Sequence, residues 1–180
     1  MKATGIVRRI DDLGRVVIPK EIRRTMRIRE GDPLEIYTNS EGEVIFKKYS
    51  PMGELASFAG QLCETLNKTT GYPAVITDRD TVIAAAGAPR RDVLDKRISE
   101  DIEHVMENRQ IFHLKAAEPH LPVCEGYDKY FAGIAAPIIS EGDISGCVVF
   151  LWSEGMELPG DTEYKLAQTI AGFLSRQMEG

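Results

Sequence analysis

Three consecutive apolar residues, Val16-Val17-Ile18, lie in a segment of about 50 residues that offers little to cover them. Successive side chains of a strand point to opposite faces, so this run needs apolar cover on both sides. A segment of this size, without a disulfide or an evident metal site, is close to the lower limit for independent stability. We therefore expect a second copy of the chain to supply the missing cover, and we predict an obligate dimer.

The charge of the chain is unevenly distributed. The net charge is −6, yet residues 1–50 carry 11 Lys and Arg against eight Asp and Glu, whereas residues 51–180 carry 11 against 20. Within residues 1–29 the excess rises to nine basic against three acidic residues. A local excess of this kind is typical of a segment that binds nucleic acid, even when the whole chain is acidic.

Composition excludes several classes of protein. With 43% apolar and 28% charged residues, wholesale disorder is excluded. No apolar stretch approaches the roughly 18 residues of a membrane span, and the N-terminus does not resemble a signal peptide, so we expect a cytoplasmic protein with no membrane partner. Three cysteines without a CxxC pair suit a reducing compartment better than a disulfide framework.

Residues 1–50 are predicted to form short strands around one short helix. Gly5–Ile10 and Arg15–Ile18 have the composition of strands, and the sequence between them is typical of a turn. Pro19 then stands where a helix of about two turns would begin. Alternating apolar residues on both sides of Asn39–Gly42 predict a hairpin.

Residues 51–180 are predicted to form a second, α+β domain, which begins near Ser50–Gly53. A long amphipathic helix should run from Leu55 to about Gly71, and Ser99 should cap a further helix. Strands, a loop over Ala116–Tyr127, a hairpin and a closing helix follow. This order describes an antiparallel sheet with helices packed on it.

Arginines are placed on three separate predicted elements of the first domain. A charge run is usually a solvated face, but here each element delivers guanidinium groups. The planar guanidinium forms bidentate bonds to phosphate and to the O6/N7 edge of guanine. No aromatic residue lies between the arginines, which favours duplex DNA over single strands. The arginines are Arg8, Arg9, Arg15, Arg23 and Arg24.

The stretch Thr4–Thr25 closely resembles the DNA-binding half of the AbrB family of transition-state regulators, as do Leu34–Tyr37 and Val44–Tyr49. The resemblance implies a swapped-hairpin β-barrel in which two chains interleave through residues 1–50. It also implies which residues contact DNA. The main contacts would be Arg8, Arg15, Arg23 and Arg24, with Arg9 and Lys2 as secondary candidates.

The remainder resembles a GAF domain, a small-molecule-sensing α+β fold, most clearly at Gly133–Ile138 and Gly142–Val149. An AbrB-type DNA-binding domain joined to a GAF-like regulatory domain is similar to developmental transcription regulators of spore-forming bacteria. The resemblance implies activation or repression of sporulation-type genes through double-stranded DNA. We expect a tetramer if the first and last helices of the GAF-like domain also pair; a dimer stays open, as does an unidentified small-molecule effector.

Other chemistry is considered at two places in residues 51–180. His113, His120 and Cys124 lie within twelve residues, but their spacing matches no standard zinc pattern, so we expect loop or pocket-wall residues, with no metal and no cofactor. Arg90-Arg91 and Lys96-Arg97 would suit the rim of an anionic ligand pocket, although a solvated surface is the preferred interpretation.

Two alternative functions remain. Some GAF domains are cysteine-based reductases, which makes a thiol enzyme the first alternative, although only the histidines near Cys124 would lower a thiol pKa. Cys63 and Cys147 are expected to be core residues. The second alternative is an antitoxin with an AbrB-type head, which the long patterned remainder disfavours. We expect a protein that is not an enzyme.

Overall fold

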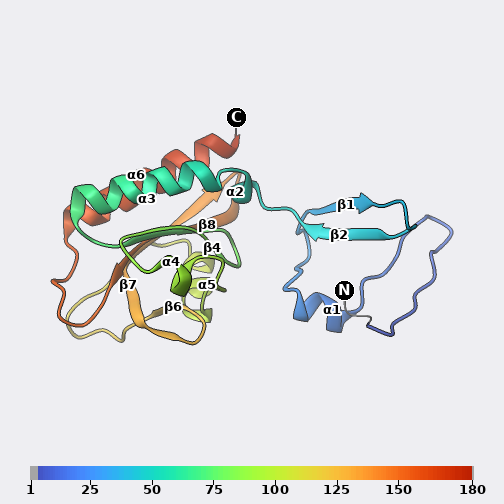
Figure 1. The fold of residues 1–180 in the computed structure, drawn as a ribbon, viewed down its shortest axis with the longest axis horizontal. Coiled ribbons are helices and arrows are strands. Elements are labelled where there is room, and N and C mark those ends of the chain that lie inside the picture. Colours follow the sequence, from blue (N-terminus) through green and yellow to red (C-terminus); the bar gives the residue numbers. More distant parts are fainter. Residues whose placement is uncertain (1–3, 180) are drawn as a thin grey trace. The chain divides into compact units, whose positions relative to one another are not determined.

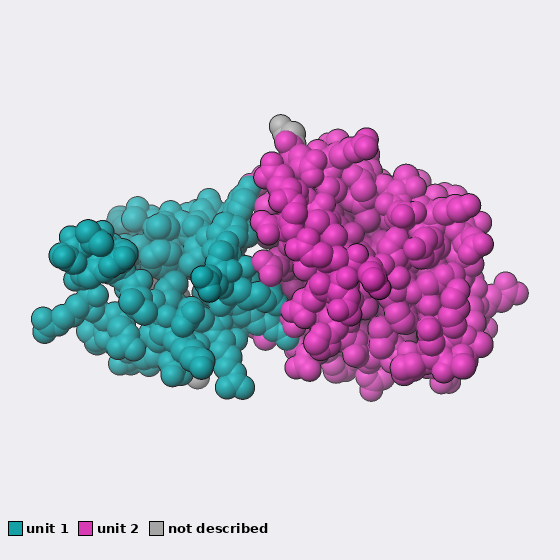
Figure 2. Space-filling model, turned by 180° about the vertical axis from the view of Figure 1, so that it is seen from behind, with its two compact units in different colours: residues 1–49 teal, residues 50–180 magenta. Residues whose placement is uncertain are grey.

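The structure is a computed structural model that describes residues 4–179. The chain divides into two compact units, residues 1–49 and residues 50–180, coloured separately in Figure 2. We call them the first unit and the second unit.

The first unit contains one helix and one hairpin. Helix α1 (Lys20–Thr25) directly follows Pro19, whose missing N–H is no loss at a helix start. Strands β1 (Leu34–Thr38) and β2 (Val44–Lys48) pair antiparallel, and the Asn39 side chain accepts bonds from the backbone N–H groups of Glu41 and Glu43 in the turn. The predicted helix and hairpin are confirmed.

The two strands predicted before α1 are absent from the described part of the single chain. Gly5–Ile10 and Arg15–Ile18 are irregular, and only the turn between them is formed. A strand needs a neighbouring strand for its backbone N–H and C=O groups, and the hairpin β1–β2 does not supply one here. The prediction of strands within one chain is therefore wrong.

The first unit has no hydrophobic core of its own. Among residues 4–49, Pro19 alone is buried, and the exposed fraction reaches 86% for Val7 and 71% for Val17. Isolated apolar residues on a surface are ordinary, but a unit whose apolar residues are nearly all exposed is not. The exposed large apolar residues of this unit are Ile6, Val7, Ile10, Leu13, Val16, Val17, Met26, Ile36, Tyr37, Val44, Ile45, Phe46 and Tyr49.

The second unit is an antiparallel sheet with helices on both faces (Figure 1). The strands lie in the order β4-β3-β8-β7-β5, and β6 pairs with β7. The elements are α2 (Pro51–Glu54), α3 (Ala56–Thr70), β3 (Ala74–Thr77), β4 (Val82–Ala86), α4 (Arg90–Val93), α5 (Glu100–Glu107), β5 (Phe112–His113), β6 (Pro122–Cys124), β7 (Tyr127–Ser140), β8 (Asp143–Trp152) and α6 (Asp161–Glu179).

Alternate residues of the strands pack into two hydrophobic cores, one on each face of the sheet. On the face covered by α3 and α6, Ile76 and Phe150 pack with the fully buried Met52 of α2. On the face covered by α4 and α5, Val75 and Val149 form a second cluster. This period of two is what a sheet buried on both sides requires.

Several predicted boundaries of the second unit are confirmed. Helix α3 ends at Gly71, whose φ of +79° is the left-handed conformation that favours glycine. The Ser99 hydroxyl accepts a bond from the backbone N–H of Ile102 at 3.2 Å and caps α5. The loop predicted over Ala116–Tyr127 is only partly correct, because it contains β6. Within residues 4–179, no helix has the length and apolar character needed to cross a membrane.

Candidate nucleic-acid interface

Helix α1 presents three cations on one face. Lys20, Arg23 and Arg24 occur at i, i+3 and i+4, the spacing of neighbours on a helix surface, and all three are exposed. Ile22 lies on the other face and is half-buried. Two arginines in the last turn, with Glu21 in the first, agree with the helix dipole.

Asp11 organises the turn that carries Arg15. Its Oδ1 accepts the backbone N–H groups of Leu13 at 3.0 Å and Arg15 at 2.8 Å, and its Oδ2 accepts Nε–H of Arg15 at 2.8 Å. These bonds, the backbone N–H of Arg15 first, lower the pKa of Asp11 below its ordinary value. Gly14 adopts a φ of +75°, which lets the chain turn back.

The side chains of the remaining predicted arginines are exposed and form no bond within the described residues. Arg8 and Arg9 lie in the irregular segment before the turn. Within residues 4–179, the side chain of neither residue has a hydrogen-bond or ion-pair partner, and the same holds for the side chains of the three cations of α1. Such side chains are available to phosphate groups without first giving up a carboxylate. Lys2 lies outside the described residues.

Other basic residues of the first unit take part in internal bonding. The Lys48 Nζ donates to the carbonyl of Arg27 at 2.9 Å and lies 3.6 Å from Asp32 Oδ2, which also accepts the backbone N–H of Arg29. The exposed basic residues that precede or lie on α1 form a separate group. We call this group the cation set; it consists of Arg8, Arg9, Arg15, Lys20, Arg23 and Arg24, and it does not include Lys47, which is exposed on β2.

Lys20 was not among the predicted site residues. Its position three residues before Arg23 and four before Arg24 was the available signal, because that spacing places all three on one helix face. Within the described residues, no hydrogen bond or ion pair joins Arg15 to the residues of α1, and Arg15 differs from the rest of the cation set by its bond to Asp11.

The residues considered for metal binding lie in three different environments. His113 Nε2 is 2.7 Å from the carbonyl of Pro159, and its Nδ1 is 3.1 Å from Lys115 Nζ. The ring of His120 packs against Trp152, and Cys124 is buried in the core on the α5 side. Across residues 4–179, no group of three or more His, Cys, Asp and Glu side chains is arranged to hold a metal ion.

All three thiols are buried. Burial raises the pKa of Cys63 to about 12 and that of Cys124 to about 11, and it raises the pKa of Cys147 as well. Lys96 opposes this shift only in part at Cys124. Since the thiolate is the nucleophile, these side chains are poorly suited to covalent catalysis at neutral pH.

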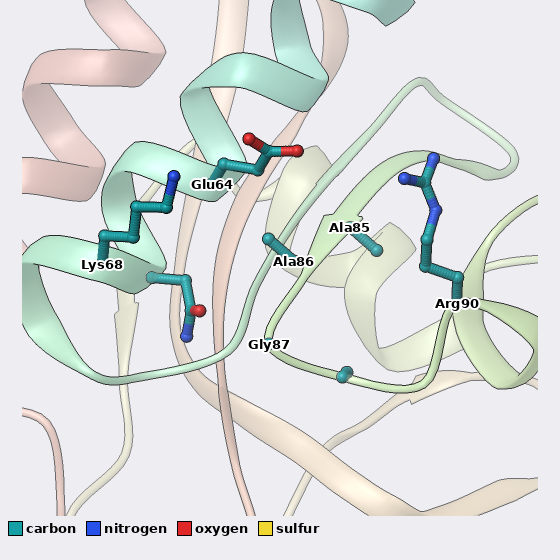
Figure 3. A pocket seen from close by; sticks show the side chains of 8 residues that line it. Glu64, Lys68, Ala85, Ala86, Gly87 and Arg90 are labelled. Carbon is teal, nitrogen blue, oxygen red and sulfur yellow. The ribbon is translucent and has the colours of Figure 1, made fainter.

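A cavity of about 330 Å³ opens between α3 and the segment that follows β4. Figure 3 shows Glu64 and Lys68 projecting from α3 and Arg90 from the start of α4, with Ala85, Ala86 and Gly87 between them. Neither Lys68 nor Arg90 has an ion-pair partner in the part of the chain that the structure describes. Of the four basic residues considered for a pocket rim, only Arg90 lines this cavity.

Comparison with known proteins gives matches along the whole chain. Residues 54–179 match the family described as "Stage V sporulation protein T C-terminal, transcription factor", and residues 7–53 match "Antidote-toxin recognition MazE, bacterial antitoxin". The chain is 49% identical to stage V sporulation protein T of Bacillus subtilis (strain 168), with 99% of each chain covered.

Two further similarities concern one part of the chain each. The transition state regulatory protein AbrB of the same organism is 63% identical over 51 residues, which are 28% of this chain and 52% of that protein. The GAF domain of the phosphoenolpyruvate-protein phosphotransferase from Acinetobacter superposes with a TM-score of 0.56 at 14% identity, over 74% of this chain and 84% of that chain. At that identity the likeness shows the fold alone, which is GAF-like in the second unit.

Proposed function

Since the chain belongs to the family of stage V sporulation protein T, with an AbrB-like first unit and a GAF-like second unit, we propose that it is a transcription regulator of sporulation-type genes. It would act in the cytoplasm by binding double-stranded DNA through the first unit. The observation that carries the proposal is the cation set, of which five members have side chains without a hydrogen-bond or ion-pair partner among residues 4–179. Arg8, Arg15, Arg23 and Arg24 are the proposed main contacts, with Arg9, Lys20 and Lys2 secondary.

The first unit is proposed to work as an interleaved dimer, each chain supplying strands to the other in a swapped-hairpin barrel. The support is the nearly complete exposure of its apolar residues, including Val7 and Val17. A second copy is the occupant that suits them, because the irregular segments Gly5–Ile10 and Arg15–Ile18 also need backbone partners. Dimerisation would double the number of cations that meet one duplex.

A tetramer would follow if the second units also paired through α3 and α6. These helices lie side by side on one face of the sheet (Figure 1), where Phe58 of α3 lies 5.8 Å from Phe173 of α6 between ring centroids. Phe173 remains 41% exposed, which leaves apolar surface for a partner helix.

The cavity beside α3 is the proposed effector site. Lys68 and Arg90 favour a small anionic metabolite, and Glu64 would repel a second negative group on that side. The short helix α2 and then α3 follow the junction of the two units in the chain, so an effector held against α3 would change the relative orientation of the DNA-binding units. A thermal-shift screen against anionic metabolites, with Arg90→Gln and the control Arg91→Gln, tests this site.

The thiol-enzyme alternative is disfavoured by the burial of all three cysteines. An antitoxin role is suggested by the description of the family matched at residues 7–53, but the family matched at residues 54–179 is described as a transcription factor. We propose that the protein is not an enzyme.

Fluorescence anisotropy with a labelled duplex tests the DNA-binding proposal. The full chain should bind duplex DNA, and Arg23→Ala should weaken binding to every duplex sequence by removing phosphate contacts. Lys47→Ala is the matched control, because Lys47 is also exposed but lies on β2, outside the cation set. Equal losses in the two variants would contradict this placement of the DNA-binding face.

A further inference from the structure

Arg15 differs chemically from the rest of the cation set. Asp11 Oδ2 accepts Nε–H of Arg15 at 2.8 Å. Among the described residues, no carboxylate forms an ion pair with any other side chain of the cation set. A pair of opposite charges has no net charge. Arg15 therefore adds less to the long-range attraction of DNA than its neighbours do.

The bond to Asp11 fixes the direction of the Arg15 side chain. The same carboxylate accepts the backbone N–H groups of Leu13 and Arg15, and the backbone N–H of Asp11 donates to the carbonyl of Arg15 at 3.1 Å. The guanidinium is thus tied at Nε to the turn that carries it. Its two terminal nitrogens have no partner in residues 4–179, and the Arg15 side chain is 69% exposed.

A guanidinium held at Nε leaves the two terminal nitrogens as a pair of parallel donors. This pair matches the N7 and O6 acceptors of guanine in the major groove. A phosphate contact would gain nothing from an adjacent carboxylate, since the carboxylate repels the phosphate, whereas a base contact gains from a fixed direction.

We propose that Arg15 reads a guanine edge and that Asp11 is its positioning residue, while the other three main contacts, Arg8, Arg23 and Arg24, meet phosphates. The inference rests on the proposed DNA-binding function and adds to it the residue that determines sequence preference. The bond to Arg15 requires an ionised Asp11 carboxylate, and this carboxylate is ionised at neutral pH because its pKa lies below the ordinary 3.8.

The test uses full-length protein and a duplex selected by that protein from a randomised pool. Each guanine is replaced in turn by 7-deazaguanine, which lacks the N7 acceptor but keeps Watson–Crick pairing. Wild-type protein should lose about fivefold or more in affinity at one guanine per half-site, since a complete bidentate pair is worth about 5- to 150-fold.

Variants assign the lost contact to Arg15 and Asp11. Asp11→Asn keeps an oxygen for the backbone N–H groups but offers no carboxylate to Nε, so its affinity should no longer depend on that guanine. The affinity of Arg15→Lys should also no longer depend on that guanine, because lysine lacks the planar pair of donors. This variant leaves Asp11 and its bonds to the backbone of the turn in place. Asp12→Asn is the matched control: it removes the same charge from the same turn, and Asp12 has no bond to Arg15 among the described residues.

The outcomes separate this inference from the proposed function. If wild-type protein binds duplex DNA with no sensitive guanine, or if Arg15→Lys or a folded Asp11→Asn remains as sensitive as wild type, the assignment is overturned while DNA binding stands. If Asp12→Asn loses the sensitivity as fully as Asp11→Asn, the loss reflects charge and the positioning role is overturned. If the full chain binds no duplex at all, the proposed function fails and the assignment fails with it.

Discussion

Val17 provides a quantitative test of the dimer proposed for the first unit. Replacing valine with alanine removes two methylene equivalents, each contributing about 0.8 kcal/mol when buried. Because 71% of Val17 is exposed in the single chain, burial by a partner would involve about 1.1 kcal/mol per chain and about 2.3 kcal/mol per dimer. The dimer dissociation constant should therefore rise about 50-fold.

The assay is sedimentation of a fragment comprising residues 1–50 over a range of concentrations, followed in parallel by circular dichroism. Helix and sheet signals should be lost together on dilution, at higher concentrations for Val17→Ala than for wild type. Glu41→Ala, in the exposed hairpin turn, should change the unfolding free energy by no more than about 0.5 kcal/mol. A dissociation constant unchanged by Val17→Ala, or a folded monomeric fragment, would refute the reasoning.

Further predictions concern charge, titration and the second unit. Arg23→Ala should reduce the slope of log K against log salt by about 2, since a dimer loses two charges, and Lys47→Ala should leave it unchanged. The pKa of Asp11 is lower in the folded state than its ordinary value of 3.8. Its ionised carboxylate therefore stabilises the folded turn at pH values above 3.8, and this stabilisation is lost as the pH falls through the folded-state pKa. An NMR titration of Asp11 with a midpoint at or above pH 3.8 would contradict this. Native protein at pH 8 should resist alkylation, because a thiol with a pKa of about 11 is only about 0.1% thiolate, and rapid modification of Cys124 would disprove its burial. Cys124→Ser should lower the unfolding free energy by about 1–3 kcal/mol, because it buries a hydroxyl without a hydrogen-bond partner. DNA affinity should stay unchanged, and loss of DNA affinity in the folded variant would argue against a purely structural thiol.

Local chemistry predicted much of the fold. The helix end near Gly71, the Ser99 cap and the hairpin around Asn39–Gly42 each depend on residues close together in the chain, and all three are confirmed. The α+β class of the second unit followed from the order of its elements.

Features that depend on distant contacts were missed. The strand character of Arg15–Ile18 indicated apolar cover on both faces, but a single chain does not provide it, so that segment is irregular. Cys124 was expected at the periphery; β6 pairs with β7, a contact without a local signal, and this pairing buries it. Lys68 and Arg90 line one cavity from different elements, and only the folded chain reveals that proximity.

The sequence predicted some features of the candidate DNA-binding site and missed others. The exposure of Arg8 and of the α1 arginines agrees with their expected role, which still awaits a binding measurement. The pairing of Asp11 with Arg15 was not foreseen, because i, i+4 partners are neighbours by rule only on a helix and these residues lie in a turn.

The salt dependence of duplex binding by the full-length chain tests most directly whether the four proposed main contacts of each chain in a dimer, Arg8, Arg15, Arg23 and Arg24, meet the phosphates of DNA. Four arginines from each of two chains would give a slope of log K against log salt of about −7, and a slope of about −5 if Asp11 neutralises Arg15 in both chains. We predict a slope between these values for double-stranded DNA. A slope near zero, or tighter binding to single strands than to the duplex, would contradict this function.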